Sequence, residues 1–289
     1  MSRAYLFLII QVTKKGLSDI LIQKVRNKVL ILNNKKIFTL IFSGFVLTVC
    51  SIAYAVEQEI KYMPPIVKFV LDGQLPSGPF LEQDGLIVVE MESLDAPQGW
   101  AIKNDDSNSI GRYIEWTSAD TLGTPGNALI SAKVVINNPG TYRFIWRSSI
   151  REGNNTTEAN DSFLKILANN FYGFRTSNQS IVCPRGQESS NRCDGSAPNG
   201  ASNNGWFKVY RSGGTPPNDW VWRSFTSDND AHSIFADFDQ AGEYEVQISA
   251  RSQHHAIDRF VLFRSLNNDN NVNQSFATDS ARPESVRAP

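Results

Sequence analysis

Two acidic residues, one position apart, end an apolar run in the first half of the chain, Leu86-Ile-Val-Val-Glu-Met-Glu92. Side chains at positions i and i+2 of a β-strand point to the same face, so Glu90 and Glu92 should project together. Their like charges need a cation, a base or a shared proton nearby. A later apolar run, residues 256–263, carries Asp258. If these two strands are neighbours, the three carboxylates converge on Ca²⁺, which takes oxygen ligands.

Tryptophan is abundant, and sugars stack their C–H faces on indole rings. Alternation along 141–150 assigns Trp146 to the core, on the face of Tyr142 and Phe144. Trp220 and Trp222 share one face of a strand, which indicates one buried ring and one ring near the rim. Trp206 directly follows an Asn- and Gly-rich loop, so exposure and burial are both open. Trp206 and Trp222 are therefore candidate ligand-binding residues.

An enzyme needs a more specific arrangement than this. A glycosidase requires two carboxylates facing each other across a scissile bond, and a lyase requires a base with a charge neutraliser. The available residues are Glu115, Asp237, Asp239 and His254, and they form no recognisable motif; the chain also has no G-x-S-x-G, H-E-x-x-H or P-loop. Catalysis stays uncertain, and a non-catalytic role is favoured.

The elements that must position these residues are β-strands. Short apolar or alternating runs recur between clusters of Gly, Asn, Asp and Pro, and no amphipathic helical stretch interrupts them. The predicted strands are 86–92, 112–117, 129–136, 141–150, 161–167, 205–211, 220–226, 231–238, 243–250 and 257–264. This pattern predicts an all-β sandwich.

Four motifs in this order resemble a known fold family. They are the Glu-x-Glu strand, Gly111-Arg-Tyr-Ile-Glu-Trp116, Asn160-Asp-Ser-Phe163 and Ile257-Asp-Arg-Phe-Val-Leu262. Together they are similar to the galactose-binding-like jelly rolls, above all to carbohydrate-binding modules of families 6 and 35 and their malectin-like relatives. The resemblance covers roughly residues 84–266.

This resemblance implies a jelly-roll β-sandwich, a structural calcium site and a carbohydrate ligand. It implies a sugar-facing aromatic ring at Tyr113, although a core tyrosine is an equal alternative. It also places polar ligand contacts in the loop that holds His254 and His255. A vicinal pair points to opposite sides of an extended chain, so at most one of them, assigned here as His254, faces the ligand. The two histidines depart from the small turn residue of the family. Asn160, Asp161 and Ser162 more often buttress the sandwich in such modules than contact ligand.

The N-terminal region is typical of an export signal. Lys35 and Lys36 precede an apolar run of about 13 residues, and Ala53-Tyr-Ala55 resembles a cleavage site. The run is shorter than the roughly 20 residues of a membrane span. We expect cleavage after Ala55 and a periplasmic, secreted or cell-surface protein without a stable membrane span; an uncleaved anchor and a start site further downstream are alternatives.

Two cysteines remain after such cleavage, Cys183 and Cys193, and an even number in an exported chain favours a disulfide. Two free thiols are the alternative. The bridge would hold a long polar segment, residues 168–204, which we interpret as an insertion that extends the binding face.

The predicted organisation is a signal region at 1–55, a linker at 56–83, the sandwich at 84–266 and a disordered tail at 267–289, since the tail is polar and nearly free of apolar residues. The formal net charge of −1 offers no basic surface for nucleic acid. The resulting hypothesis is a monomeric, exported, non-catalytic module that binds a polysaccharide or oligosaccharide. The alternatives are a polysaccharide lyase or glycoside hydrolase on a jelly-roll fold, or a cell-surface protein-binding or adhesive module.

Overall fold

The computed structural model describes residues 77–105, 111–187, 192–193, 202–211, 214–226, 230–266 and 271–288. The predicted signal region at 1–55 and most of the predicted linker at 56–83 lie outside these residues. In the part of the chain that is described, no helix is long and apolar enough to cross a membrane.

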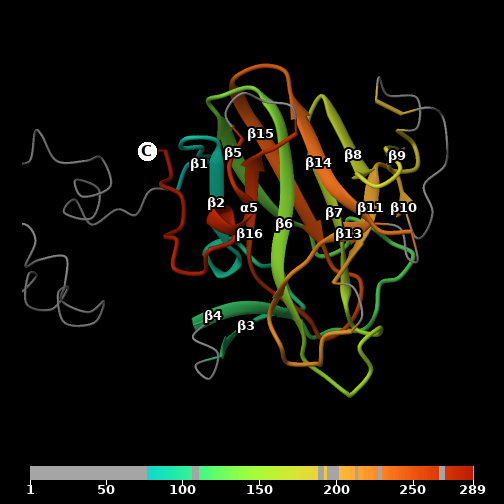
Figure 1. Ribbon diagram of the computed structural model, residues 1–289. Helices are drawn as coiled ribbons and strands as arrows, with labels where there is room; N and C mark the ends of the chain where they lie inside the picture. Colours follow the sequence, from blue (N-terminus) through green and yellow to red (C-terminus); the bar gives the residue numbers. More distant parts are fainter. Residues whose placement is uncertain are drawn as a thin grey trace, which may run out of the picture. The chain divides into compact units, whose positions relative to one another are not determined.

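Strands dominate the described residues, and sixteen of them are hydrogen-bonded into one curled sheet that closes into a jelly-roll β-sandwich (Figure 1). The first layer has the order β1 (Phe80–Leu81), β5 (Ile130–Ile136), β15 (Gly242–Ser249), β7 (Asp161–Leu167) and β11 (Trp206–Tyr210). The second contains β2 (Leu86–Glu90), β16 (His255–Arg264), β6 (Gly140–Ile150), β14 (His232–Phe238) and β8 (Asn170–Arg175). The all-β prediction is confirmed.

Shorter elements join the layers and extend their edges. β13 (Phe225–Thr226) pairs with β11 and with β14, and so links the two layers. β3 (Trp100–Asp105) and β4 (Gly111–Trp116) pair with each other, and β4 pairs with the start of β16. The remaining elements are β9 (Ser180–Val182), β10 (Ser202–Asn203), β12 (Val221–Trp222), the 3-10 turn η1 (Met91–Ser93) and the short helix α5 (Gln274–Ala277).

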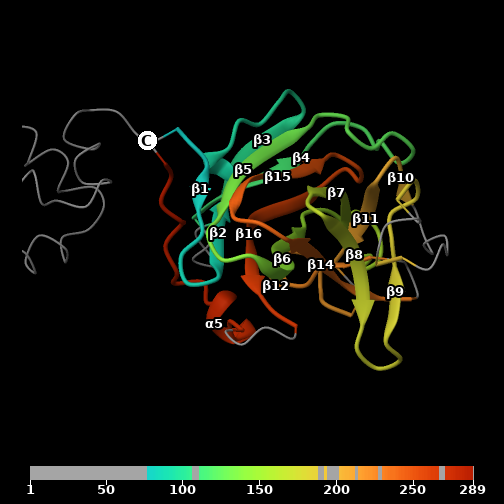
Figure 2. The same cartoon turned by 90° about the horizontal axis from the view of Figure 1, so that it is seen from above.

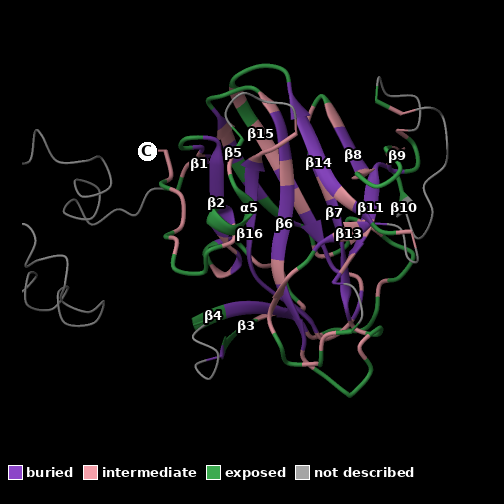
Figure 3. Cartoon of the chain, viewed as in Figure 1, coloured by how far each residue is buried: buried purple, intermediate pink, exposed green. Residues whose placement is uncertain are grey.

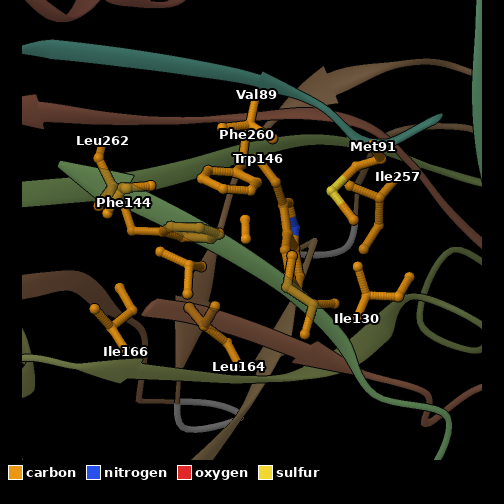
Figure 4. Packing of buried hydrophobic residues seen from close by; sticks show 14 of the residues in the cluster. Val89, Met91, Ile130, Phe144, Trp146, Leu164, Ile166, Ile257, Phe260 and Leu262 are labelled. Atoms are coloured by element: carbon orange, nitrogen blue, oxygen red, sulfur yellow. The ribbon is translucent and has the colours of Figure 1, made fainter. Parts of the chain in front are cut away.

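The core lies between the layers, where apolar side chains from both meet (Figure 4). In β5, Ile130, Ala132 and Val134 are buried and alternate with the exposed Ser131 and Lys133. This is the period-2 pattern of a strand with one face in the core and one in solvent. Trp146 is fully buried at the centre, as its alternation predicted.

In contrast, β16 is buried on both faces over almost its whole length (Figure 3). Phe260 and Leu262 point into the core, whereas Val261 and Phe263 belong to a second apolar cluster on the outer side of the sheet. The C-terminal segment covers that cluster. In the view from above, α5 lies on the side of β16 and β6 that faces away from the first layer (Figure 2).

The order of residues 271–288 corrects the expectation of a disordered tail. Ala277 is buried in the outer cluster, and Val272 packs against it. Val88 exchanges two hydrogen bonds with Ser285, donating its N–H to Oγ and accepting from the Ser285 N–H. Phe80 forms an antiparallel bridge with Arg287, so the sandwich includes β1, ahead of the predicted boundary at residue 84.

A disulfide joins Cys183 to Cys193, with 6.0 Å between their Cα atoms. Cys183 packs with Tyr172 of β8 and Phe235 of β14 in a third, small apolar cluster. The segment from 168 to 204 was interpreted as an insertion, and its first part forms β8 and β9, which pair with each other, while β8 also pairs with β14. The bridge therefore covers the outer face of these strands.

Candidate functional site

A cleft with a volume of about 700 Å³ lies where three connections between strands meet. Its lining includes Asp120 from the β4–β5 connection, Glu152 from the β6–β7 connection, His254 from the β15–β16 turn, and Asp161, Lys208 and Tyr210 from β7 and β11. Because the two strands are antiparallel neighbours, with Asp161 opposite Tyr210, they form a continuous wall beside the loops. The sandwich thus presents polar side chains from distant parts of the sequence around one hollow.

The floor of this cleft is built on the buried carboxylate of Asp161. Its Oδ1 accepts hydrogen bonds from Arg251 Nη1 at 2.5 Å and Ser252 Oγ at 2.6 Å, and its Oδ2 lies 3.4 Å from Lys208 Nζ. The Ser252 N–H also donates to the Asp161 backbone oxygen. A carboxylate with this many donors holds both cations in one geometry.

His254 stands on one side of the cleft in a left-handed backbone conformation, with φ of 65°. Its ring is held at both ends, because Nδ1 lies 2.8 Å from Glu115 Oε1 and Nε2 lies 2.8 Å from Glu152 Oε2. Its N–H donates to the Trp116 backbone oxygen. Glu115 is itself buried and pairs with Lys103 Nζ at 2.8 Å. Of the four predicted ligand-binding residues, His254 is the one that the structure places in the cleft lining.

The three predicted aromatic residues lie elsewhere. Tyr113 is 3% exposed; its ring packs edge-on against Trp220, and the Arg151 guanidinium stands over it. Trp206 is 6% exposed. Trp222 packs against the outer cluster beneath the C-terminal segment. These three rings are buried or packed against other side chains of the protein. The aromatic residue in the cleft lining is Tyr210.

Sequence reasoning missed Lys208, Tyr210 and Arg251, since none of them belongs to a local motif. The Asn160-Asp-Ser motif was the available signal for the floor, and Asp161 and Ser162 are both buried there. Arg251 lies two residues after the end of β15, so the pairing of β15 with β7 brings it to Asp161.

The three carboxylates predicted to bind calcium lie where β2, η1 and β16 meet. β2 ends at Glu90 and Glu92 belongs to η1, so the two do not project from one strand as predicted. Asp258 occupies a bulge in β16. Arg259 Nη2 donates to Glu90 Oε1, and Arg147 Nη1 lies 3.5 Å from Asp258 Oδ2. Among the described residues, no group of three His, Cys, Asp or Glu side chains is arranged to hold a metal ion.

Burial dominates the electrostatics of these carboxylates. It raises the pKa of Glu90 to about 7 against the opposing charge of Arg259, and raises the pKa of Asp258 to about 6 against Arg147 and Arg259. It also raises the pKa of Glu92. Glu92 Oε2 and Asp258 Oδ1 are buried without a hydrogen-bond partner. These two oxygens fit an oxygen-seeking cation, whereas the two arginines compete with it.

No family model matches the chain, and no curated protein matches its sequence. Similar solved structures include the GH26-CBM35 β-(1,4)-mannanase of Podospora anserina, at 12% identity and a TM-score of 0.35, over 64% of this chain and 29% of the mannanase. The C-terminal CBM6 of a marine laminarinase from Zobellia galactanivorans is 12% identical at a TM-score of 0.32, over 62% and 99% of the two chains. The CBM6 of Cellvibrio mixtus lichenase 5A, solved with cellotriose, is 10% identical at a TM-score of 0.32, over 62% and 98%. These three solved structures are similar to this chain at 10–12% identity, over 62–64% of its length.

Proposed function

We propose that this protein is a non-catalytic carbohydrate-binding module and that the cleft over Asp161 takes a polysaccharide or oligosaccharide. The observation that carries this proposal is the locked floor, in which one buried carboxylate fixes Arg251, Ser252 and Lys208. Because these polar groups are already ordered, ligand binding does not carry the entropy cost of ordering them.

The chemistry of the cleft suits a sugar. A sugar hydroxyl both donates and accepts, and the cleft offers acceptors such as Asp120 and Glu152 beside donors such as Lys208 and Gln253. Tyr210 adds an aromatic ring to the wall, against which the C–H face of a sugar can pack.

The charges of the cleft favour a neutral glycan. The acidic side chains in the lining are Asp120, Glu152, Glu158 and Asp161, and the cations Lys208 and Arg251 are both spent on Asp161. A uronate or sulfate group would face the remaining carboxylates, because the positive charges of Lys208 and Arg251 are already balanced in part by Asp161, and like charges at close range repel.

A second candidate function is a polysaccharide lyase or glycoside hydrolase. The observation that favours it is the Glu115–His254–Glu152 arrangement, which places an oriented imidazole at the cleft. In the present geometry, however, both ring nitrogens face carboxylate oxygens, so His254 has no free nitrogen with which to accept a proton from a substrate.

We also propose that Ca²⁺ binds at Glu90, Glu92 and Asp258 as a structural ion. The buried oxygens Glu92 Oε2 and Asp258 Oδ1, which have no hydrogen-bond partner, support this. Binding would require Arg259 to release Glu90.

Export of the chain is a proposal from the N-terminal sequence. N-terminal sequencing of the protein from the culture medium or periplasm should begin at Val56.

The experiment that tests the function uses the full chain and a panel of neutral and acidic polysaccharides. Both retention on the polymer and the release of reducing or unsaturated ends are measured. Retention on a neutral glycan without product supports the proposal. Release of product that disappears in Glu115→Gln or His254→Ala would establish the enzyme instead, and neither retention nor product would favour a protein-binding or adhesive module.

Variants locate the site. Arg251→Met should abolish most of the retention, since it removes the main partner of Asp161 at the cleft floor. The matched control is Arg175→Met, which breaks another Arg–Asp pair, with Asp230, away from the cleft lining. Equal retention by both variants would move the binding site out of this cleft.

A further inference from the structure

Arg211 is the most unusual charged residue in the structure, because its side chain is fully buried at 0% exposure. Its Nη2 donates to the backbone oxygens of Thr215 and Pro216, at 2.9 and 2.8 Å. Its Nε and Nη1 have no hydrogen-bond partner. Within the described ranges, no carboxylate forms an ion pair with it. A buried cation without a counter-charge costs several kcal/mol in general, so this arrangement calls for an explanation.

Other polar groups near Arg211 lack partners too. His255 is fully buried, and its Nδ1 lies 2.8 Å from Ser162 Oγ while its Nε2 is unpartnered. Burial, together with the positive charge of Arg211, lowers the pKa of His255 to about 3, so this ring is neutral. The Trp146 ring lies 5.5 Å from His255, and Trp146 Nε1 and Ser148 Oγ are buried without partners.

These groups share one side of the second layer. Trp146 and Ser148 are two residues apart on β6 and so point the same way. His255 pairs with Ile150, the next residue in that series, and Trp146 points into the core (Figure 4). The unpartnered atoms of Trp146, Ser148 and His255 therefore lie on the inner side of β6 and β16, and the charge of Arg211, which begins the loop after β11, acts on His255.

Most of these groups can only donate. A guanidinium N–H and an indole N–H accept nothing, and His255 adds a donor in the tautomer that carries its proton on Nε2. The charge of Asp219 acts on Arg211 without forming an ion pair, and a set of donors around such a buried positive charge is complementary to an anion. We infer that Arg211 Nε and Nη1 bind a small monovalent anion, such as chloride, with the His255, Trp146 and Ser148 donors beside it.

The site lies directly beneath the cleft floor. Along three elements, a residue of the cleft lining is followed by a buried polar residue: Asp161 by Ser162, Tyr210 by Arg211, and His254 by His255. The anion would balance the positive charge of Arg211, which lies under this part of the cleft floor. The inference does not depend on the proposed function, because it concerns the interior and not the glycan.

Crystals of the full chain soaked in bromide provide the direct test. Bromide scatters anomalously and substitutes for chloride, so we expect an anomalous peak at hydrogen-bonding distance from Arg211 Nε or Nη1. An electron-density peak without anomalous signal at that position would identify water and overturn the inference, as would empty density.

Melting of the full chain gives an independent measure. At constant ionic strength, replacing gluconate with chloride should raise the melting temperature, because a ligand of the native state stabilises it by RT ln(1 + [L]/Kd). Above Kd, each tenfold rise in chloride corresponds to about 1.4 kcal/mol. Identical melting in the two salts would contradict the inference.

Arg211→Met should abolish the chloride dependence. The control is Arg223→Met, which removes a nearby but exposed positive charge and should leave the dependence intact. Loss of the effect in both variants would show a general charge effect and no defined site. If Arg211→Met does not fold, the bromide experiment on the parent protein still tests whether an anion binds at Arg211.

Discussion

His254 Nδ1 and Glu115 Oε1 lie 2.8 Å apart, although 139 residues separate them in the sequence. The contact joins the β15–β16 turn to β4, and the second nitrogen of the same ring reaches Glu152 in the β6–β7 connection. His254 thus connects three elements around the cleft through the two nitrogens of one ring.

The first prediction concerns the contacts of His254 with Glu115 and Glu152. His254→Ala removes both contacts and releases Glu152, so the affinity for a neutral glycan should fall about five- to tenfold, which corresponds to roughly one hydrogen bond. Isothermal titration with the retained polysaccharide measures it. Lys133→Met, which breaks an exposed pair with Glu243 on β5, should leave the affinity unchanged. Unchanged binding in His254→Ala would exclude this residue from the site.

Calcium dependence is the second prediction. At a hundredfold excess over Kd, Ca²⁺ should stabilise the protein by about 2.7 kcal/mol. Thermal melting with and without chelator should differ for the parent protein and much less for Glu92→Gln or Asp258→Asn. If the melting curves of the parent protein with and without chelator superimpose, calcium does not bind there, and Arg147 and Arg259 are the counter-ions of Glu90 and Asp258.

A buried carboxylate at the edge of the sandwich provides the third prediction. Glu82 is 3% exposed and accepts from the backbone N–H groups of Gly85, Asn137 and Asn138. Glu82→Gln replaces an acceptor-only group with one that also donates, and should lower the free energy of unfolding by roughly 2 kcal/mol. Urea denaturation measures this loss. In the control Glu243→Gln, where the affected pair is exposed, a loss under about 1 kcal/mol is expected.

The strands of the sandwich could be predicted because their patterns are local. The run 161–167 coincides with β7, and the run 243–250 differs from β15 by one residue at each end. β8 was missed, since its residues lie in a polar segment whose apolar face packs against a neighbour far along the chain, Phe235 of β14. Residues 271–288 were missed for a related reason, because they dock largely through backbone hydrogen bonds, which composition does not reveal.

The docked C-terminal segment leads to the fourth prediction. Ala277 is 1% exposed against the outer cluster on β2, β6 and β16. Ala277→Asp buries an unpaired charge there, so the segment should detach and become sensitive to protease, with a loss of stability of roughly 3 kcal/mol. Ser280→Asp places the same charge at an exposed position and should change neither property. Equal protease resistance in the two variants would contradict the docking.

The candidate site was less predictable than the fold. His254 was predicted to contact the ligand, whereas the Asn160-Asp-Ser motif was expected to buttress the sandwich. Arg251 and Lys208 meet Asp161 only through pairing between distant strands. Tryptophan content alone does not locate a sugar site, since an indole ring that suits a sugar also suits a core, and Trp206 is buried. Alternation along a strand distinguishes its two faces but does not show which face another segment later covers.

The last prediction follows from the buried neutral ring of His255. Its folded-state pKa is lowered from the ordinary 6.5 to about 3, first by burial and then by the charge of Arg211. Below pH 6.5 the His255 side chain takes up a proton in the unfolded chain but not in the folded chain. The contribution of His255 to the free energy of unfolding is therefore fully present above pH 6.5 and is lost as pH falls toward 3. The loss is at most about 1.4 kcal/mol per pH unit. Glu90 and Asp258 act in the opposite direction, because their raised pKa values favour the folded state as pH falls. The comparison of the parent protein with His255→Asn cancels that opposing trend. Urea denaturation between pH 8 and pH 4 should show that the parent loses more stability than the variant below about pH 6.5, and parallel profiles would mean that His255 does not titrate between the two states.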